Sequence, residues 1–117
     1  MTNWLNKMVI IHKNLASGRW QTLSLCEQFA NIGSEVSRTI YWQEAGKTEN
    51  MEKSALRVLE LIDLTIADKR WKGRLFEVLR LREIFCDRFF GKNIYNTTSR
   101  KIKDYFLFFA LMARKNQ

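Results

Sequence analysis

The chain has 117 residues, a hydrophobic fraction of 46% that includes eight Phe and four Trp, and a formal net charge of +8. This composition excludes a disordered chain and predicts one packed domain over residues 1–117. Because the chain has no proline and only five glycines, it favours long helices. It shows no alternating strand pattern, so we predict an all-α fold.

The positive charge belongs to the second half of the chain. Residues 1–67 carry seven Lys/Arg against seven Asp/Glu, whereas residues 68–117 carry thirteen against five. Such a one-sided distribution is typical of proteins that bind a phosphate-rich or acidic partner. A solvated basic surface without a partner is the alternative interpretation.

The N-terminal region contains only a short apolar segment. The run from Met8 to Ile11 is too short for a signal peptide or a membrane-spanning helix. Cys26 and Cys86 occur without a CxxC motif or a metal-ligand spacing. We therefore expect a cytoplasmic protein that holds no metal or cofactor and does not bind a membrane.

Two helices are predicted before the glycine-containing turn near residue 46. The first is short, covers residues 3–15 and ends at Gly18. The second covers residues 20–45 and stops at Gly46. Gly33 costs this helix about 1 kcal/mol relative to alanine, which favours a close approach of another helix or a ligand. The core stripe of this helix consists of Leu25, Phe29, Ile32, Val36 and Ile40. Beside it runs a polar row that is either solvated or a semi-buried seam; the row consists of Gln28, Asn31, Glu35, Arg38 and Trp42.

The third predicted helix spans residues 50–67 and leads into a basic loop. Asp63 lies at the edge of the apolar stripe of this helix. In the loop, residues 68–73, cations surround Trp71, a combination that is typical of sites that grip a nucleic-acid backbone and stack on a base. An alternative interpretation makes Trp71 a plug that anchors the loop. The cations are Lys69, Arg70 and Lys72.

The fourth predicted helix, residues 72–90, ends at Gly91 and carries an arginine within its apolar stripe. Arg82 falls in the middle of this stripe, and an arginine is almost never buried without a partner. We therefore expect Arg82 to be largely buried and bonded to Glu35 or Asp63, as part of a structural polar network. The stripe consists of Leu75, Val78, Leu79, Phe85, Cys86 and Phe89.

The last predicted helix, residues 98–114, follows a loop from Gly91 to Thr97. Its core face leaves Tyr105 and Phe108 in need of cover, which predicts a homodimer. The four main helices and the opening helix predict an up-and-down four-helix bundle with a short extra N-terminal helix. The first turns of the last helix add three residues to the basic surface that is predicted to bind RNA or an acidic protein: Arg100, Lys101 and Lys103.

The segment LRLREIFCDRFFGKN, residues 79–93, resembles the most distinctive helix of the HEPN superfamily of small four-helix domains. The preceding segment, ALRVLELIDLTIAD, is similar to the helix that precedes the motif in that family. HEPN ribonucleases carry an Arg, then four to six intervening residues, and then a His. Arg82 matches the Arg, but Asp87 stands where the family has His.

The resemblance thus implies the scaffold and not the activity. An imidazole with a pKa near 6.5 suits acid–base chemistry at neutral pH, whereas a carboxylate with a pKa near 3.9 is a poor acid and repels phosphate. The leading hypothesis is a non-catalytic HEPN-like module that binds RNA or an acidic protein. The alternatives are a purely structural oligomerisation bundle and a divergent, metal-independent ribonuclease of toxin–antitoxin or defence type. The candidate catalytic residues of that ribonuclease are Arg82, Glu83, Asp87 and Tyr95.

Overall fold

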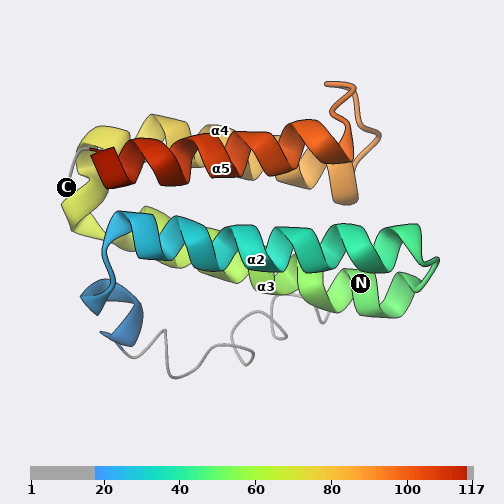
Figure 1. Cartoon of the computed structure of the whole chain (residues 1–117), viewed down its shortest axis with the longest axis horizontal. Helices are drawn as coiled ribbons and strands as arrows, with labels where there is room; N and C mark the ends of the chain where they lie inside the picture. The colour runs from blue at the N-terminus through green and yellow to red at the C-terminus, as the bar shows by residue number, and fades with distance from the viewer. Residues whose placement is uncertain (1–17, 116–117) are drawn as a thin grey trace.

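A computed structural model describes residues 18–115 of the chain. Within this range the chain forms four α-helices and short 3₁₀ segments, and no strand (Figure 1). The predicted all-α class is confirmed, and the helix predicted over residues 3–15 lies outside the described residues. The elements are η2 (Trp20–Thr22), α2 (Leu25–Glu44), α3 (Thr48–Ala67), η3 (Lys69–Arg74), α4 (Leu75–Phe89) and α5 (Ser99–Lys115).

Helix α2 begins later than predicted because Ser24 and Glu27 form a capping box. The Glu27 N–H donates to Ser24 Oγ (3.1 Å), and the Ser24 N–H donates to Glu27 Oε1 (2.8 Å). These bonds satisfy two backbone donors that a helix start leaves without partners. At the other end, Gly46 has φ +73°, the left-handed conformation that glycine adopts readily just past a helix C-terminus.

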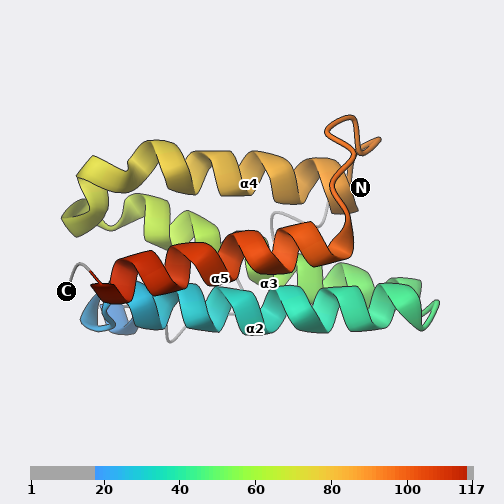
Figure 2. The same ribbon diagram turned by 45° about the horizontal axis from the view of Figure 1, so that its top comes forward.

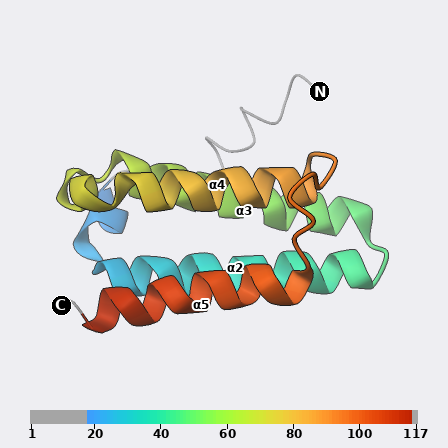
Figure 3. The same ribbon diagram turned by 90° about the horizontal axis from the view of Figure 1, so that it is seen from above.

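The four helices lie lengthwise along the molecule in two layers. Helices α2 and α3 form one layer and α4 and α5 the other (Figures 1 and 2). Helix α2 packs closely on both α3 and α5, and α4 packs mainly on α3. Seen from above, α4 overlies α3 and α5 overlies α2 (Figure 3). None of the helices in residues 18–115 is long and apolar enough to cross a membrane.

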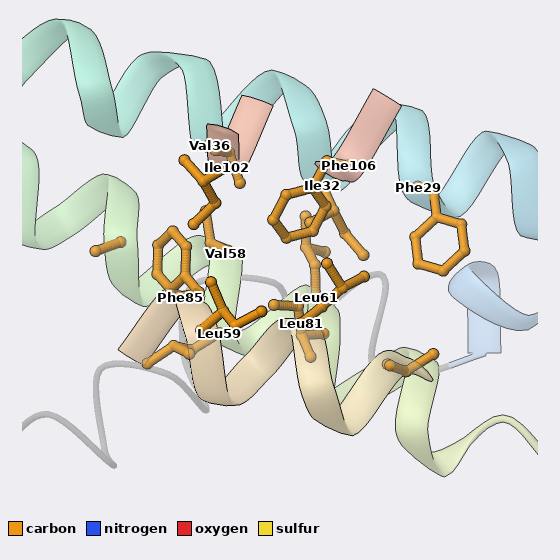
Figure 4. Close-up of a cluster of buried hydrophobic side chains, with 14 of the residues drawn as sticks. Phe29, Ile32, Val36, Val58, Leu59, Leu61, Leu81, Phe85, Ile102 and Phe106 are labelled. Carbon is orange, nitrogen blue, oxygen red and sulfur yellow. The ribbon is translucent and has the colours of Figure 1, made fainter. Parts of the chain in front are cut away.

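Side chains from all four helices meet in one core between the layers (Figure 4). Burial of each such aliphatic or aromatic side chain contributes about 1.5–3 kcal/mol, so this cluster is the main stabilising feature of the fold. The labelled members are Phe29, Ile32 and Val36 of α2, Val58, Leu59 and Leu61 of α3, Leu81 and Phe85 of α4, and Ile102 and Phe106 of α5.

The buried face of α4 is rotated relative to the prediction. Leu81 and Ile84 are buried, whereas Leu75 and Leu79, which were predicted for the core, are exposed. The rotation places Arg82 at the edge of the buried face instead of its middle. This change decides how Arg82 is paired.

Candidate functional site

Arg82 is held by Asp63, one of the two carboxylates expected to neutralise it. Arg82 Nε lies 2.7 Å from Asp63 Oδ1, and its Nη2 lies 3.4 Å from Oδ2. The two side chains are 35% and 40% exposed, so the pair is half-buried and not enclosed in the core. The hydrogen bond to Asp63 holds the pKa of the Arg82 guanidinium above its ordinary value.

Glu35 does not join this pair, although it was the other expected partner. Its Oε1 accepts a hydrogen bond from Arg38 Nη1 (3.0 Å) on the same helix, and its Oε2 is buried without a hydrogen-bond partner among residues 18–115. The expected network therefore lacks its Glu35 member. Arg82 Nη1 instead approaches Cys86 Sγ at 3.7 Å. Burial raises the pKa of the Cys86 thiol, so this thiol is protonated at neutral pH.

The candidate catalytic residues of the ribonuclease hypothesis do not converge. Arg82 and Asp87 are five positions apart on α4, which places them about 140° apart around the helix. Arg82 turns to α3, whereas Asp87 accepts the backbone N–H groups of Ile94 (2.8 Å) and Tyr95 (3.1 Å) and so fixes the loop after α4. Glu83 does lie beside Tyr95, whose hydroxyl donates to Glu83 Oε1 (2.7 Å). This bond raises the pKa of Tyr95.

The basic turn η3 is fixed by a polar network that engages two of the predicted contact residues. Arg70 binds Asp68 through Nη2–Oδ2 (2.7 Å) and Nε–Oδ1 (3.0 Å), and it donates to the Leu23 carbonyl (2.7 Å). Trp71 Nε1 donates to Gln28 Oε1 (2.9 Å), and Gln28 Nε2 donates to Asp68 Oδ2 (3.0 Å). The hydrogen bond from Arg70 holds the pKa of Asp68 below its ordinary value.

Arg70 and Trp71 therefore anchor the turn to α2, Trp71 as a plug, and their polar groups are engaged within the chain. The polar row predicted on α2 is partly buried and partly solvated. Gln28 is buried in this network, whereas Asn31 and Arg38 are exposed to water. Lys69 and Lys72 are exposed and form no ion pair within the part of the chain that the structure describes.

The predicted basic surface divides between two ends of the molecule. Figures 1, 2 and 3 differ by rotation about the long axis, and in all of them η3 and the end of α5 lie at one end while α5 begins at the other. Helix α5, with 17 residues, is about 25 Å long. Lys69 and Lys72 therefore share an end with Arg114 and Lys115, whereas the opposite end holds Arg100, Lys101 and Lys103.

The end that contains η2, η3 and the last turn of α5 carries the larger excess of positive charge. Its segments 18–27, 68–77 and 114–115 hold seven Lys/Arg against three Asp/Glu, whereas segments 41–53 and 87–104 at the other end hold seven against five. Six cations there form no ion pair with any residue in the range 18–115. We call them the basic end: Arg19, Lys69, Lys72, Arg74, Arg114 and Lys115.

A groove of about 510 Å³ runs between α2 and α5. Gly33 lines it, and a Cβ added to Gly33 would meet no atom within 4 Å. The close approach expected at this glycine is therefore absent among the described residues. Beside the groove, the outward face of α5 exposes more than half of each of three apolar side chains, Leu107, Phe108 and Leu111.

One exposed aromatic residue near the basic end escaped the sequence analysis. Phe76, in the first turn of α4, is 82% exposed. The available signal was its place outside the predicted apolar stripe, four residues after Lys72 in a basic segment. Helical periodicity identifies core residues, so it does not mark an aromatic residue on the solvent side of the helix.

No group of three or more His, Cys, Asp or Glu in residues 18–115 is arranged to hold a metal ion. A scan against known protein families, a search of curated proteins and a search of solved structures each found no match to this chain. The HEPN resemblance therefore stays a prediction.

Proposed function

We propose that the chain is a non-catalytic, HEPN-like module, an up-and-down four-helix bundle that binds RNA in the cytoplasm through its basic end. The observation that carries the proposal is the gathering of six cations, unpaired within residues 18–115, from three segments that are distant in sequence. Cations gathered in this way attract phosphates, and their binding releases counterions from the nucleic acid.

The geometry around α4 supports the absence of catalysis. Both carboxylate oxygens of Asp87 accept backbone N–H groups of the loop after α4, so this side chain is engaged in fixing that loop. Arg82 is engaged by Asp63 on another side of the helix. A ribonuclease would need these groups around one phosphate.

Charge-neutralising variants at the two ends test the proposal. Lys69→Gln/Lys72→Gln removes two exposed cations from the basic end, and the matched control, Arg100→Gln/Lys101→Gln, removes two from the opposite end. Binding is measured by fluorescence anisotropy of a labelled single-stranded RNA over a series of salt concentrations. We expect the first variant to reduce the slope of log K against log salt by about 1.4, because each single-strand phosphate contact contributes about 0.7. The control should leave the slope unchanged.

Three outcomes would contradict this proposal. Equal losses in both variants would mean that only net charge matters. Absence of binding at low salt would leave an acidic protein as the partner, or a purely structural bundle. Cleavage of the labelled RNA by the unmodified chain would favour the divergent ribonuclease.

We also propose that the chain forms a homodimer through α5 and the groove beside it. The exposed ridge of Leu107, Phe108 and Leu111 is a contiguous apolar surface, which marks an interaction site more often than scattered apolar residues do. In a two-fold contact the ridge and groove of one copy face those of the other. Lys103 and Asp104, which both line the groove, have opposite charges and so complement each other across such an axis.

A further inference from the structure

Phe76 is the most exposed large apolar side chain on α4. Its side chain is 82% exposed, and Leu79, one turn further along, is 46% exposed. A ligand that covers the phenyl ring removes apolar surface from water and is favoured for that reason. Phe76 lies on the solvent side of a helix whose opposite face is packed into the core, so the fold presents the ring to solvent.

Two further planar groups follow Phe76 along the outer face of α4. Arg80 is one turn after Phe76, so the two side chains are neighbours on the helix surface. The Arg80 guanidinium lies over the Tyr95 ring, 5.2 Å from its centroid. Tyr95 is held in place by the bond from its hydroxyl to Glu83 (2.7 Å) and by the bond from its backbone N–H to Asp87 (3.1 Å). Phe76, Arg80 and Tyr95 therefore form a row of flat groups on a rigid support.

Cations flank this row on the side of η3. Lys69 and Lys72 lie in η3, directly before α4, and both are exposed. The turn that carries them is rigid, because the Asp68 side chain is only 2% exposed and is bound by Arg70. Of the α4 carboxylates, Glu83 and Asp87 lie toward the other end of the row, whereas Glu77 lies beside Phe76 in the first turn. Because the cations of η3 outnumber Glu77, an anionic backbone is attracted more strongly to η3 than to the far end.

We infer that the outer face of α4 binds single-stranded nucleic acid, with one base stacked on Phe76 and a neighbouring base on the Arg80–Tyr95 pair. The phosphates of the strand lie against Lys69 and Lys72. This inference rests on the proposed function and adds the type of strand and the residues that contact its bases. A duplex fits poorly because its base faces are stacked on one another, whereas a single strand presents them to aromatic side chains and to arginine.

A protein partner suits this surface less well than a nucleic-acid strand. An apolar protein surface that covered Phe76 and the neighbouring Lys72 would remove the charge of Lys72 from water without supplying a partner. A nucleic-acid strand supplies an apolar base face and an anionic phosphate in each repeat unit. The flat groups on α4, with the cations of η3 beside them, offer contacts of both kinds.

The experiment compares Phe76→Ala and Phe76→Trp with the parent chain. The matched control is Tyr41→Ala, which removes an aromatic side chain that is 62% exposed on α2, at the end away from η3. Each protein is titrated by fluorescence anisotropy against an unstructured RNA of about twelve nucleotides and against a hairpin duplex with the same number of phosphates. Melting temperatures check that the exposed substitutions leave the fold intact.

We expect Phe76→Ala to weaken single-strand binding about 5- to 150-fold, the loss that corresponds to one base–aromatic stack. Its affinity for the duplex should not change. Phe76→Trp should retain the affinity of the parent chain, and its added tryptophan fluorescence should be quenched by the single strand. Tyr41→Ala should bind both RNAs as the parent chain does.

The failure of this inference is distinguishable from the failure of the proposed function. Unchanged single-strand affinity of Phe76→Ala, together with a loss in Lys69→Gln/Lys72→Gln, would overturn the stacking site and leave RNA binding intact. Equal losses on single strand and duplex would also overturn it. A lower molecular mass of Phe76→Ala in solution would assign Phe76 to a protein interface. If the parent chain binds neither RNA, both proposals are wrong.

Discussion

Arg82 and Asp63 connect α4 to α3 through an ion pair that water reaches. Breaking a buried pair typically costs 3–5 kcal/mol, whereas an exposed pair contributes about 0–1 kcal/mol. Because its side chains are 35% and 40% exposed, the contribution of this pair to stability should lie near that of an exposed pair. We expect Arg82→Ala to reduce the free energy of unfolding by about 1 kcal/mol and to lower the melting temperature by about 4–8 °C. Urea and thermal unfolding measure both quantities.

The matched control for this change is Arg80→Ala, on the same helix. Arg80 is 46% exposed, and its distance to Glu83 is 3.5 Å, longer than the 2.7 Å between Arg82 and Asp63. Removal of Arg80 should therefore reduce the free energy of unfolding less than removal of Arg82 does. The Asp63→Ala variant and the double variant complete a cycle that isolates the pair. A loss of 4 kcal/mol or more in Arg82→Ala would show that the pair is enclosed in the core.

At the scale of elements, one ionised carboxylate attaches η3 to α2. Arg70 holds the pKa of Asp68 below its ordinary value, so the folded chain binds this proton more weakly than the unfolded chain. The resulting stabilisation is complete above the unfolded pKa, near 3.9, and is lost as the pH falls through the folded pKa. We expect Asp68→Asn to cost about 2 kcal/mol at pH 7, because it weakens charge-assisted hydrogen bonds. It should also make the loss of stability below pH 4 shallower.

Urea unfolding at a series of pH values measures this effect. Glu49→Gln serves as the control, because the one ion pair of Glu49 among residues 18–115 is an exposed pair with Lys53, and the curve of this variant should follow that of the parent chain. If the Asp68→Asn and parent curves run parallel from pH 7 to pH 2, Asp68 is not the group that links the turn to pH.

Helix α4 shows how far sequence patterns determine an element. Its residues satisfy the helical period on more than one face, and the stripe through Leu75 and Leu79 was as regular as the one through Leu81 and Ile84 that is buried. The position of the other helices decides between them, and periodicity does not contain that information. The sequence limited the partners of Arg82 to Asp63 and Glu35, because both carboxylates lie beside apolar stripes, but it did not decide between them; the structure pairs Arg82 with Asp63.

The polar network around η3 was harder to predict from the sequence than the helices were. Gln28 and Asp68 are forty positions apart, so no local pattern relates them. The basic loop therefore resembled a nucleic-acid contact in composition, although Arg70 and Trp71 are engaged in holding it. By contrast, the aliphatic and aromatic core of α2, including Phe29, Ile32 and Val36, followed the predicted stripe, because a single amphipathic face leaves only one orientation.

At the scale of the whole molecule, the apolar ridge of α5 lies between two positively charged ends. The middle of the molecule, between the two ends, holds four Lys/Arg against four Asp/Glu. It consists of segments 28–40, 54–67, 78–86 and 105–113. The exposed ridge of α5 lies in this neutral region. A dimer formed there avoids the repulsion between like charges that a contact between the basic ends of two copies would cause. It also leaves the basic end of each copy free for the proposed binding of RNA.

Leu107→Asp tests the dimer directly. The side chain is more than half exposed in the single chain, so the substitution should not disturb the fold, but a dimer through the ridge would bury an unpaired carboxylate at a cost of several kcal/mol. Light scattering coupled to size exclusion should give about 28 kDa for the parent chain, twice the 14.0 kDa of one copy, and about 14 kDa for the variant. Phe76→Asp places the same charge on α4 and should remain dimeric. A parent chain that stays monomeric at every concentration, or a dimeric Leu107→Asp, would exclude this interface.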